Sequence, residues 1–347
     1  MISLWEKRGA GTLLWPLSLA YRLAVRLRNR RFDTRPESAC WFDVPVISIG
    51  NLTVGGAGKT PLVMAVAEWI RSEGKRPAIL SRGFGRKSAS PLIVCDGNRI
   101  LGEAVDTGDE PLMLARRLRD VPVLVGSERM ETGRIAIRRF HPDVLILDDG
   151  FQHRKVARDL DAVVLDATCP FGNGWLIPAG PLREPLSALK RADLVVLSRS
   201  DQAENTDALV QAVRRWTGAP VLTGRHKPVD WIRLDIEEVH PLDHLRDRFC
   251  LAFSGIGNPE SFEKTLRSTG IQRLKSLRFR DHHRYTQREI RRIDRAAEEF
   301  GAVALVTTEK DAARLGPDWR THLPVYALRV VFEADGGKET VMRMLSL

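Results

Sequence analysis

The sequence is poor in cysteine and has no cysteine motif. Its 347 residues include only four cysteines, Cys40, Cys95, Cys169 and Cys250, which lie far apart. None of them forms a Cys-x-x-Cys pair, so neither a zinc ribbon nor a small disulfide framework is expected. A reducing cytosol is the simplest setting for such a chain.

Aromatic residues and acidic residues are also in short supply. Aromatics make up 7% of the chain, and no group of them forms a platform on which nucleic-acid bases would stack. The 54 lysines and arginines outnumber the 44 aspartates and glutamates, which leaves a formal net charge of +10. An anionic partner is therefore expected: nucleic acid, a phospholipid surface or a phosphorylated substrate. The missing aromatic platform argues against nucleic acid.

Residues 1–31 combine basic and apolar side chains, and Glu6 is their only acidic residue. On a helix, Leu13, Leu17, Ala20, Ala24 and Leu27 fall on one side, and Arg22, Arg26 and Asn29 fall on the other. This pattern predicts an amphipathic helix on an anionic membrane surface. Its apolar part is shorter than the about 20 residues of a spanning helix. Packing on its own domain is the alternative, and a cleaved signal peptide fits less well because arginines fill the cleavage region.

Short apolar runs then alternate with helical patterns. The runs, each expected to be a strand, are Val44–Ile49, Pro77–Leu80, Leu92–Cys95, Val121–Val125, Val144–Leu147, Ala162–Leu165, Leu194–Leu197, Val221–Leu222, Cys250–Phe253, Val303–Val306 and Val325–Leu328. Such alternation predicts an α/β fold, with a doubly wound, mostly parallel sheet and helices on both faces.

The length of the chain favours two domains. Residues 224–244 show no clear helical periodicity, and we place the junction there. The expected division is an N-terminal helix (1–31), a nucleotide-binding α/β domain (32–225) and a smaller C-terminal α/β domain (226–347).

The most informative segment is Val46–Pro61. An apolar strand leads into the turn Gly55–Gly58, and Lys59 and Thr60 open a helix. Backbone N–H groups and the positive helix end of such a loop cradle phosphates, while the lysine reaches the β- and γ-phosphates and the hydroxyl can bind Mg²⁺. Thr53 replaces the usual glycine, so the loop has the deviant form Gly-Gly-x-Gly-Lys-Thr. The residues predicted to bind nucleotide are Thr53, Gly55, Gly56, Ala57, Gly58, Lys59 and Thr60.

Two carboxylates, Asp148 and Asp149, follow the apolar run Val144–Leu147. A buried strand that ends in aspartate is the usual partner of a phosphate loop, because Mg²⁺ prefers carboxylate and water oxygens. A turn-capping role for Asp149 is the alternative. Gln152 and His153, just downstream, are candidates for contacts with phosphate or acceptor.

Further candidates lie in loops. Asp109 and Glu110 precede Pro111 at the expected start of a helix, where they either begin the helix or serve an acceptor hydroxyl and a metal. Asp281–Arg284 lies just before a capping box at Thr286 and Glu289, which places two histidines at a helix entrance. Other basic loops offer guanidinium groups for phosphate, among them those of Arg129 and Arg183.

Taken together, these motifs resemble the tetraacyldisaccharide 4′-kinase family, the lipid A kinases of Gram-negative bacteria. The matching motifs occur in family order from Gly50 to Asp311 and include the phosphate loop, Ser-Arg-Gly-Phe-Gly, Gly-Asp-Glu-Pro, Asp-Asp-Gly-Phe-Gln-His, Pro-Leu-Arg-Glu-Pro, Asp-His-His-x-Tyr and Thr-Thr-Glu-Lys-Asp. The resemblance implies transfer of phosphate from ATP to the 4′-hydroxyl of a tetraacylated glucosamine disaccharide 1-phosphate. It also implies work at the cytosolic face of the inner membrane, on a membrane-resident substrate, with no nucleic acid and no inferred protein partner.

The resemblance also implies residue roles. Lys59 and Thr60 would bind triphosphate and Mg²⁺, and Asp148 and Glu110 would serve the metal. Asp109 and His282 would form an acceptor-activating pair across a closing domain cleft. The residues expected to line the site are Asp149, Gln152, His153, Arg129 and Arg183.

A second class of function fits some of the same residues. A P-loop switch or metal-insertion NTPase would also carry the deviant loop, and Ser198–Asp201 loosely resembles a guanine-reading segment. Such a protein would hydrolyse nucleotide without phosphorylating an acceptor. Stimulation of turnover by lipid favours the kinase.

Overall fold

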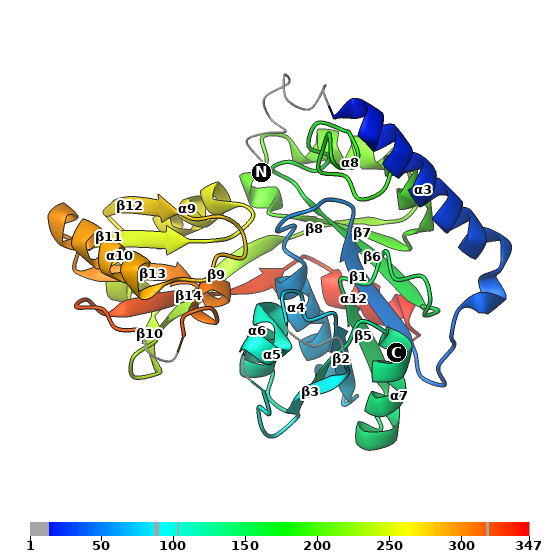
Figure 1. The fold of residues 1–347 in the computed structure, drawn as a ribbon, viewed down its shortest axis with the longest axis horizontal. Helices are drawn as coiled ribbons and strands as arrows, with labels where there is room; N and C mark the ends of the chain where they lie inside the picture. Colours follow the sequence, from blue (N-terminus) through cyan, green and yellow to red (C-terminus); the bar gives the residue numbers. More distant parts are fainter. Residues whose placement is uncertain (1–13, 87–89, 103, 317–318, 347) are drawn as a thin grey trace.

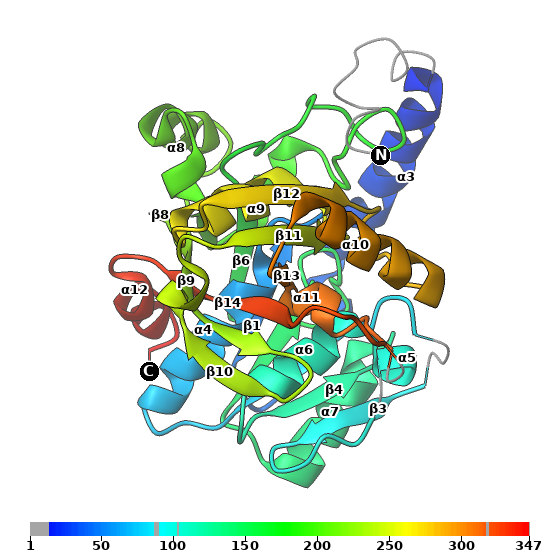
Figure 2. The same ribbon diagram turned by 90° about the vertical axis from the view of Figure 1, so that its left-hand side faces the viewer.

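Two β-sheets with their helices organise the protein (Figure 1). The computed structural model describes residues 14–86, 90–102, 104–316 and 319–346. We call the eight-stranded sheet and its helices the first unit, and the six-stranded sheet and its helices the second unit. Figure 2 shows the second unit facing the viewer, in front of the first.

The first sheet is parallel except at one edge. Its strands are β1 (Val46–Asn51), β2 (Pro77–Ser81), β3 (Leu92–Asp96), β4 (Pro122–Val125), β5 (Val144–Asp148), β6 (Leu160–Asp166), β7 (Leu194–Ser198) and β8 (Val221–Thr223). They lie in the order β3-β4-β2-β5-β1-β6-β7-β8, and only the pair β3–β4 is antiparallel. Central strands such as β1 and β5 are buried along their whole length, as expected for a parallel sheet with helices on both faces.

Helices cover both faces of this sheet. They are α4 (Lys59–Ser72), α5 (Ala104–Thr107), α6 (Asp109–Arg117), α7 (Arg129–Phe140) and α8 (Thr206–Arg214). Side chains of α4 and α6 share one core cluster with Ile47 and Ile49, and side chains of α7 share another with Val46. The doubly wound arrangement expected from the alternating pattern is therefore confirmed.

The second unit is a mixed sheet in the order β10-β9-β14-β13-β11-β12. Its elements are β9 (Arg225–Arg233), β10 (Glu238–Pro241), β11 (Phe249–Ser254), α9 (Pro259–Ser268), β12 (Arg273–Arg278), α10 (Gln287–Phe300), β13 (Ala304–Thr308), α11 (Glu309–Ala312) and β14 (Val325–Glu333). A short 3₁₀ turn of this unit covers Leu242–Leu245. Three others occur earlier in the chain, at Pro36–Ser38, Leu186–Arg191 and Ser200–Gln202. The capping box predicted at Thr286 and Glu289 starts α10.

The region 224–244, where no strand was predicted, forms β9 and β10. Strand β9 pairs antiparallel with β14 from Arg225 opposite Glu333 to Arg233 opposite Tyr326, and it joins the two units. Its outward positions are exposed and its inward ones mostly half-buried, with only Trp231 fully buried. Because so few of its side chains are buried, β9 has no apolar run in the sequence.

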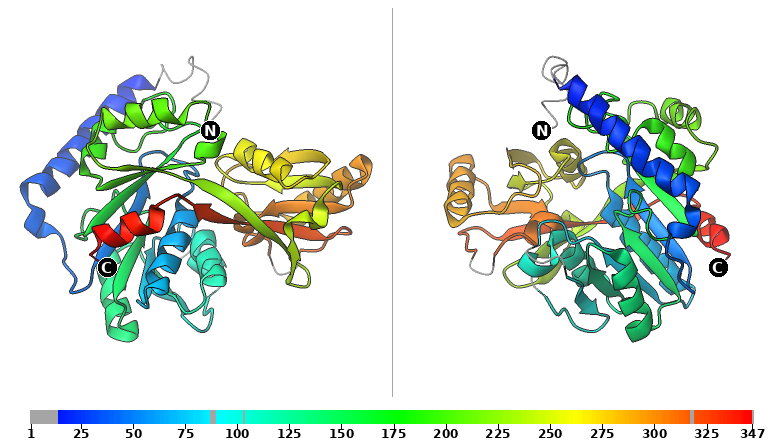
Figure 3. Two further views of the ribbon diagram at one scale, coloured as in Figure 1. Left: turned by 180° about the vertical axis from the view of Figure 1, so that it is seen from behind. Right: turned by 45° about the vertical axis from the view of Figure 1, so that its right-hand side comes forward.

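The C-terminal helix returns to the first unit. Helix α12 (Gly337–Met344) lies beside α4, as Figure 3 shows, and Val341 and Met342 belong to the core cluster of α4. A Cβ on Gly337 would lie 3.0 Å from the Trp69 ring, which shows how closely the two helices approach. The division at residue 225 stays a prediction, and α12 lies on the nucleotide-binding side of it.

Helix α3 (Trp15–Thr34) lies along the outer edge of the first unit (Figure 1). It contacts the body of the protein through Ser18, Tyr21, Val25 and Asn29, which are buried or half-buried. Its other apolar side chains are exposed, and they include Trp15, Leu17, Leu19, Leu23 and Leu27. Leu17, Ala20, Ala24 and Leu27 of the predicted apolar face are thus unburied, and Leu13 lies outside the described residues. No helix in the described part of the chain is long and apolar enough to cross a bilayer.

Candidate active site

The glycine-rich loop lies at the carboxyl end of β1 and leads into α4. Gly55 and Gly58 adopt φ angles of 106° and 80°, a region that side chains other than hydrogen disfavour. A Cβ at Gly58 would come within 2.6 Å of the His226 ring. Thr53, before the loop, pairs with Leu182 in an isolated antiparallel bridge. The loop is therefore held from both sides in a conformation that needs its glycines.

Two side chains from the end of β7 hold the loop carbonyls. The Ser198 hydroxyl donates to the carbonyl of Ala57 at 2.7 Å, and the Arg199 guanidinium donates to that of Gly56 at 3.0 Å. These two contacts fix the loop carbonyls, and the Ala57 N–H bonds to the Gly55 carbonyl at 3.1 Å, so an anion would be bound by other N–H groups of the loop. Ser198 and Arg199 belong to the segment Ser198–Asp201, which loosely resembles a guanine-binding segment in sequence. In the structure these two residues bind the backbone of the phosphate loop.

Lys59 and Thr60 form the first residues of α4, at its positive end. The Lys59 ammonium donates to Asn51 Oδ1 at 3.1 Å and lies 3.2 Å from Asp149. Arg183 donates to both oxygens of Asp149 at 3.0 Å. Burial would raise the pKa of Asp149, but Lys59 and Arg183 hold it well below the ordinary value. Asp149 is thus an ionised carboxylate that holds Lys59 and Arg183 in place. Both of these cations could also bind phosphate.

Asp148 is the buried carboxylate at the end of β5. It accepts a hydrogen bond from Ser81 at 2.8 Å. Burial and the negative charges of Glu110 and Asp149 raise its pKa to about 6. A cation beside Asp148 would relieve this repulsion, so the site fits Mg²⁺. Within the described ranges, no group of three or more His, Cys, Asp or Glu side chains could hold a metal alone, so Thr60 and phosphate oxygens would complete the ligand set.

Gln152, His153 and Arg129 carry polar atoms that are buried without a partner. Gln152 donates to the Asn51 carbonyl at 3.0 Å, yet its Oε1 has no partner. The same holds for His153 Nε2 and Arg129 Nε. Burial and the charge of Arg129 lower the pKa of His153 to about 4, so this ring is neutral at physiological pH. Gln152 is next to the phosphate loop through its bond to Asn51, and a buried unpaired atom there is expected where a ligand completes the hydrogen bonding.

Asp109 and Glu110 form the first turn of α6. Gly108 occupies the cap position, and Asp109 does not cap the helix. Instead, Asp109 Oδ2 accepts a hydrogen bond from Arg314 Nε at 2.7 Å, and Glu110 lies 2.8 Å from the Lys310 ammonium. Both carboxylates of the first unit therefore meet cations of the second unit.

His282 lies on the loop before α10, with φ at 59°. Its Nδ1 is 3.7 Å from Asp109 Oδ2 and 3.2 Å from Arg314 Nη2. The structure thus brings Asp109 and His282 together across the two units. The neighbouring His283 pairs instead with Glu289 at 3.0 Å.

Sequence reasoning did not single out Asn51, Ser81, Lys310 or Arg314. Lys310 lies within the quoted motif Thr-Thr-Glu-Lys-Asp, and Ser81 lies within Ser-Arg-Gly-Phe-Gly, so these motifs gave a signal for both. Ser81 and Asn51 end strands β2 and β1 and could have been found by examining every polar residue at the carboxyl edge. Arg314 follows α11 and belongs to no motif.

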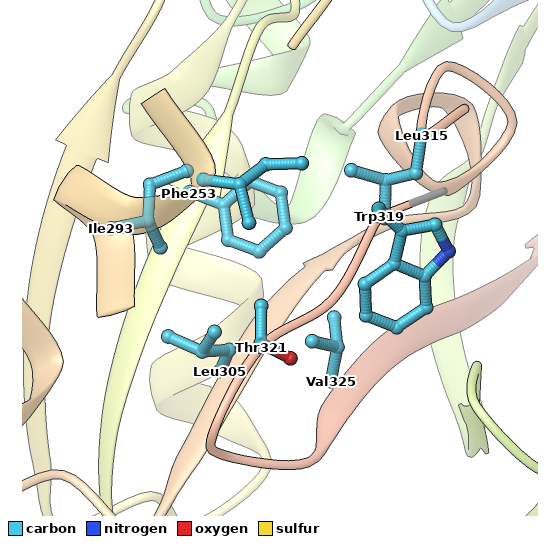
Figure 4. Close-up of a pocket in the computed structure, with 8 residues that line it drawn as sticks. Phe253, Ile293, Leu305, Leu315, Trp319, Thr321 and Val325 are labelled. Atoms are coloured by element: carbon cyan, nitrogen blue, oxygen red, sulfur yellow. The ribbon is translucent and has the colours of Figure 1, made fainter. Parts of the chain in front are cut away.

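A small apolar pocket lies away from these residues, inside the second unit (Figure 4). Its volume of about 10 Å³ leaves room for one water molecule at most. It is a packing gap in the core, lined by Phe253, Ile290, Ile293, Leu305, Leu315, Trp319, Thr321 and Val325.

A glycine loop that opens a helix with Lys-Thr, a buried aspartate at the end of the neighbouring strand and a doubly wound sheet define a P-loop nucleotide-binding protein. The site also holds a carboxylate–histidine pair at its rim, which a nucleotide-binding switch would not require.

The comparisons with known proteins identify the family. The family model described as tetraacyldisaccharide-1-P 4′-kinase matches residues 10–346, and the chain belongs to that family. The tetraacyldisaccharide 4′-kinase of Syntrophus aciditrophicus is 42% identical, with 94% of this chain and 92% of that protein covered. That of Anaeromyxobacter dehalogenans is 47% identical, with 87% and 81% covered.

A solved structure agrees with this assignment. The crystal structure of LpxK from Aquifex aeolicus in complex with ATP superimposes with a TM-score of 0.77 at 33% identity, covering 96% of this chain and 99% of that one. The expected fold is therefore confirmed.

Proposed function

We propose that the protein transfers the γ-phosphate of ATP to the 4′-hydroxyl of a tetraacylated disaccharide 1-phosphate in lipid A biosynthesis. The observation that carries this proposal is the pairing of two features in one site: a phosphate loop with its buried Asp148, and Asp109 with His282 at the rim. The first binds nucleotide, and the second is able to take a proton from an alcohol. Family membership supplies the identity of the acceptor.

Each part of the site has a role in this reaction. The loop residues Thr53 and Gly55–Thr60 bind the triphosphate. Thr60, Asp148 and Glu110 would hold Mg²⁺, which neutralises charge on the transferring group when bound. For Glu110, this requires that it leave or share its present partner, the Lys310 ammonium at 2.8 Å.

Asp109 is the proposed base. As it accepts the 4′-hydroxyl proton, the oxygen bonds to the γ-phosphorus, the bond to the bridging oxygen breaks, and ADP leaves. Arg183 and Asp149 position Lys59 beside the phosphates, and Arg129, Gln152 and His153 support the same wall of the site.

Helix α3 is proposed to hold the protein at the cytosolic face of the inner membrane. Leu17, Leu23 and Leu27 are each more than half exposed on it. Arg22, Arg26 and Arg30 are exposed on the same helix, which suits an anionic surface. An acylated substrate stays in the bilayer, so a bound enzyme would meet it there.

The decisive experiment is transfer of labelled γ-phosphate from ATP to purified tetraacyldisaccharide 1-phosphate in detergent micelles. Label is expected in the lipid with the parent protein and not with Lys59→Ala, because the ammonium lies at the phosphate loop. Lys338→Ala, which alters an exposed pair with Glu73, is the matched control and is expected to behave like the parent. ATP consumption without labelled lipid would instead favour the switch NTPase.

A further inference from the structure

Arg314 is a buried cation at the junction of the two units. Its side chain has no exposed surface, and every guanidinium nitrogen has a partner. Nε donates to Asp109 Oδ2 at 2.7 Å, Nη1 donates to Asp311 Oδ1 at 3.1 Å and to the Gly255 carbonyl, and Nη2 faces His282 Nδ1 at 3.2 Å. One planar group thus links both members of the proposed acceptor-activating pair.

Asp311 fixes the position of this guanidinium. It is fully buried and accepts hydrogen bonds from the Gly255 N–H at 3.0 Å, the Tyr285 hydroxyl at 3.0 Å and the Thr308 hydroxyl at 2.8 Å. These donors come from three separate segments of the second unit. A carboxylate held at so many points gives Arg314 little freedom to turn away.

We propose that Arg314 is a positioning residue that sets Asp109 and His282 in one arrangement and fixes the neutral His282 ring with its proton on Nε2. The inference rests on the proposed function, because it assigns roles within the same phosphoryl-transfer site.

The ring assignment follows from donor and acceptor chemistry. A guanidinium only donates, so His282 Nδ1 must accept from Arg314, and the ring proton of a neutral histidine is then on Nε2. At 3.7 Å, Nδ1 and Asp109 Oδ2 are too far apart for a direct hydrogen bond. Asp109 and His282 are therefore linked through the Arg314 guanidinium and not through a hydrogen bond between them.

This arrangement divides the work between the two side chains. The described contacts of Asp109 all involve Oδ2, so Oδ1 is the oxygen that we assign to the hydroxyl proton. His282 turns its Nε2–H side away from Arg314, toward Asp281 at 4.0 Å. Phe84 of the first unit packs on the imidazole with 5.0 Å between ring centroids. The His282 ring therefore has only an Nε2–H donor to offer, because its Nδ1 accepts from Arg314. Asp109 is the member of the pair that acts as the base.

The test uses the full-length protein with ¹⁵N-labelled histidine. The chain has eight histidines, and the signals missing from His282→Gln identify the His282 ring. In the parent, the nitrogen shifts are expected to show a protonated Nε2 and an unprotonated Nδ1. A proton on Nδ1 in the neutral ring would overturn the inference without any change at Arg314.

Arg314→Lys tests the consequence for catalysis. One ammonium cannot reach Asp109, Asp311 and His282 together, so kcat is expected to fall about 100-fold, the cost of a misplacement near 1 Å. The KM for ATP should stay within about twofold, because the phosphate loop is untouched, and the His282 ring should become a mixture of both tautomers. Arg278→Lys, which alters an exposed arginine paired with Glu263, is expected to match the parent in all three readouts.

The outcomes separate the two proposals. A parent-like kcat in Arg314→Lys together with mixed tautomers would overturn the positioning role. A parent protein that never labels the lipid would overturn the proposed function, while the parent ring spectrum would still decide the assignment of the proton.

Discussion

Replacing Glu309 with glutamine is expected to stabilise the protein much more at pH 8 than at pH 5. Glu309 begins α11 at the junction of the units, is 13% exposed, and lies 3.6 Å from Arg117. Burial raises its pKa to about 7, and the opposing charges of Arg117 and Arg329 do not offset this effect. The Glu309 carboxyl group therefore binds its proton more tightly in the folded protein than in the unfolded chain.

The magnitude follows from the shift. The pKa rises from the ordinary value of 4.5 to about 7, and each unit is worth about 1.4 kcal/mol, so the penalty reaches roughly 3 kcal/mol. Between pH 4.5 and 7, the folded protein binds a proton that the unfolded chain does not, so this contribution to stability falls as pH rises. Above pH 7 the penalty is complete. Glutamine cannot ionise and avoids it.

The assay is urea unfolding of the parent and Glu309→Gln at pH 5, 6, 7 and 8. The difference in unfolding free energy should grow in favour of the variant from about 1 kcal/mol at pH 5 to roughly 3 kcal/mol at pH 8. Glu298→Gln, on the exposed side of α10, is the control and should give the same small difference at every pH. A Glu309→Gln difference that is flat with pH would refute the reasoning.

Three further outcomes are expected. Gly58→Ala should weaken ATP binding at least tenfold by calorimetry, because its Cβ would collide with the His226 ring, whereas Gly74→Ala, with a similar φ but open space, should bind normally. Glu184→Ala should lower the free energy of unfolding by about 3 kcal/mol in urea, because it leaves Arg191 without its fully buried carboxylate; an unchanged midpoint would contradict this. Removing Mg²⁺ with EDTA should abolish lipid labelling and adding it back should restore labelling; transfer that persists in EDTA would remove the metal from the mechanism.

The first unit could be predicted well because its strands and its phosphate loop depend on residues close together in the sequence. Strands buried on both faces are mostly apolar along their length, so β5 and β7 stand out as almost continuous apolar runs, and β1 does so with Ser48 inside its run. Glycines at positive φ and a lysine at a helix start are likewise dictated by short-range geometry. The phosphate loop and Asp148 were predicted for these reasons.

Other features depend on contacts between distant segments. Strand β9 alternates charged and partly buried residues, which resembles a loop until its partner β14 is known. Arg314 gains its role from Asp109, which lies 205 positions earlier. Leu17, Ala20, Ala24 and Leu27 of α3 are exposed, and a membrane surface as their partner stays a prediction. Asn29, which was expected on the polar side of the helix, packs on the body of the protein. The contacts through Ser18, Tyr21 and Asn29 depend on the segment around Leu176 and Glu184.

The pairing of β9 with β14 makes the second unit a removable module in topological terms. The chain enters it on β9 and leaves it on β14, and both continue into the first unit. Arg225 and Glu333 are opposite each other at the base of this ribbon, with their Cα atoms about 5 Å apart, as in any antiparallel pair. A two-residue turn could therefore replace residues 226–332 and leave the phosphate loop, its sheet and α12 as one continuous chain. Such a miniature would carry every proposed nucleotide-binding residue but lack His282, Arg314 and also His226, whose ring lies against Gly58 of the phosphate loop.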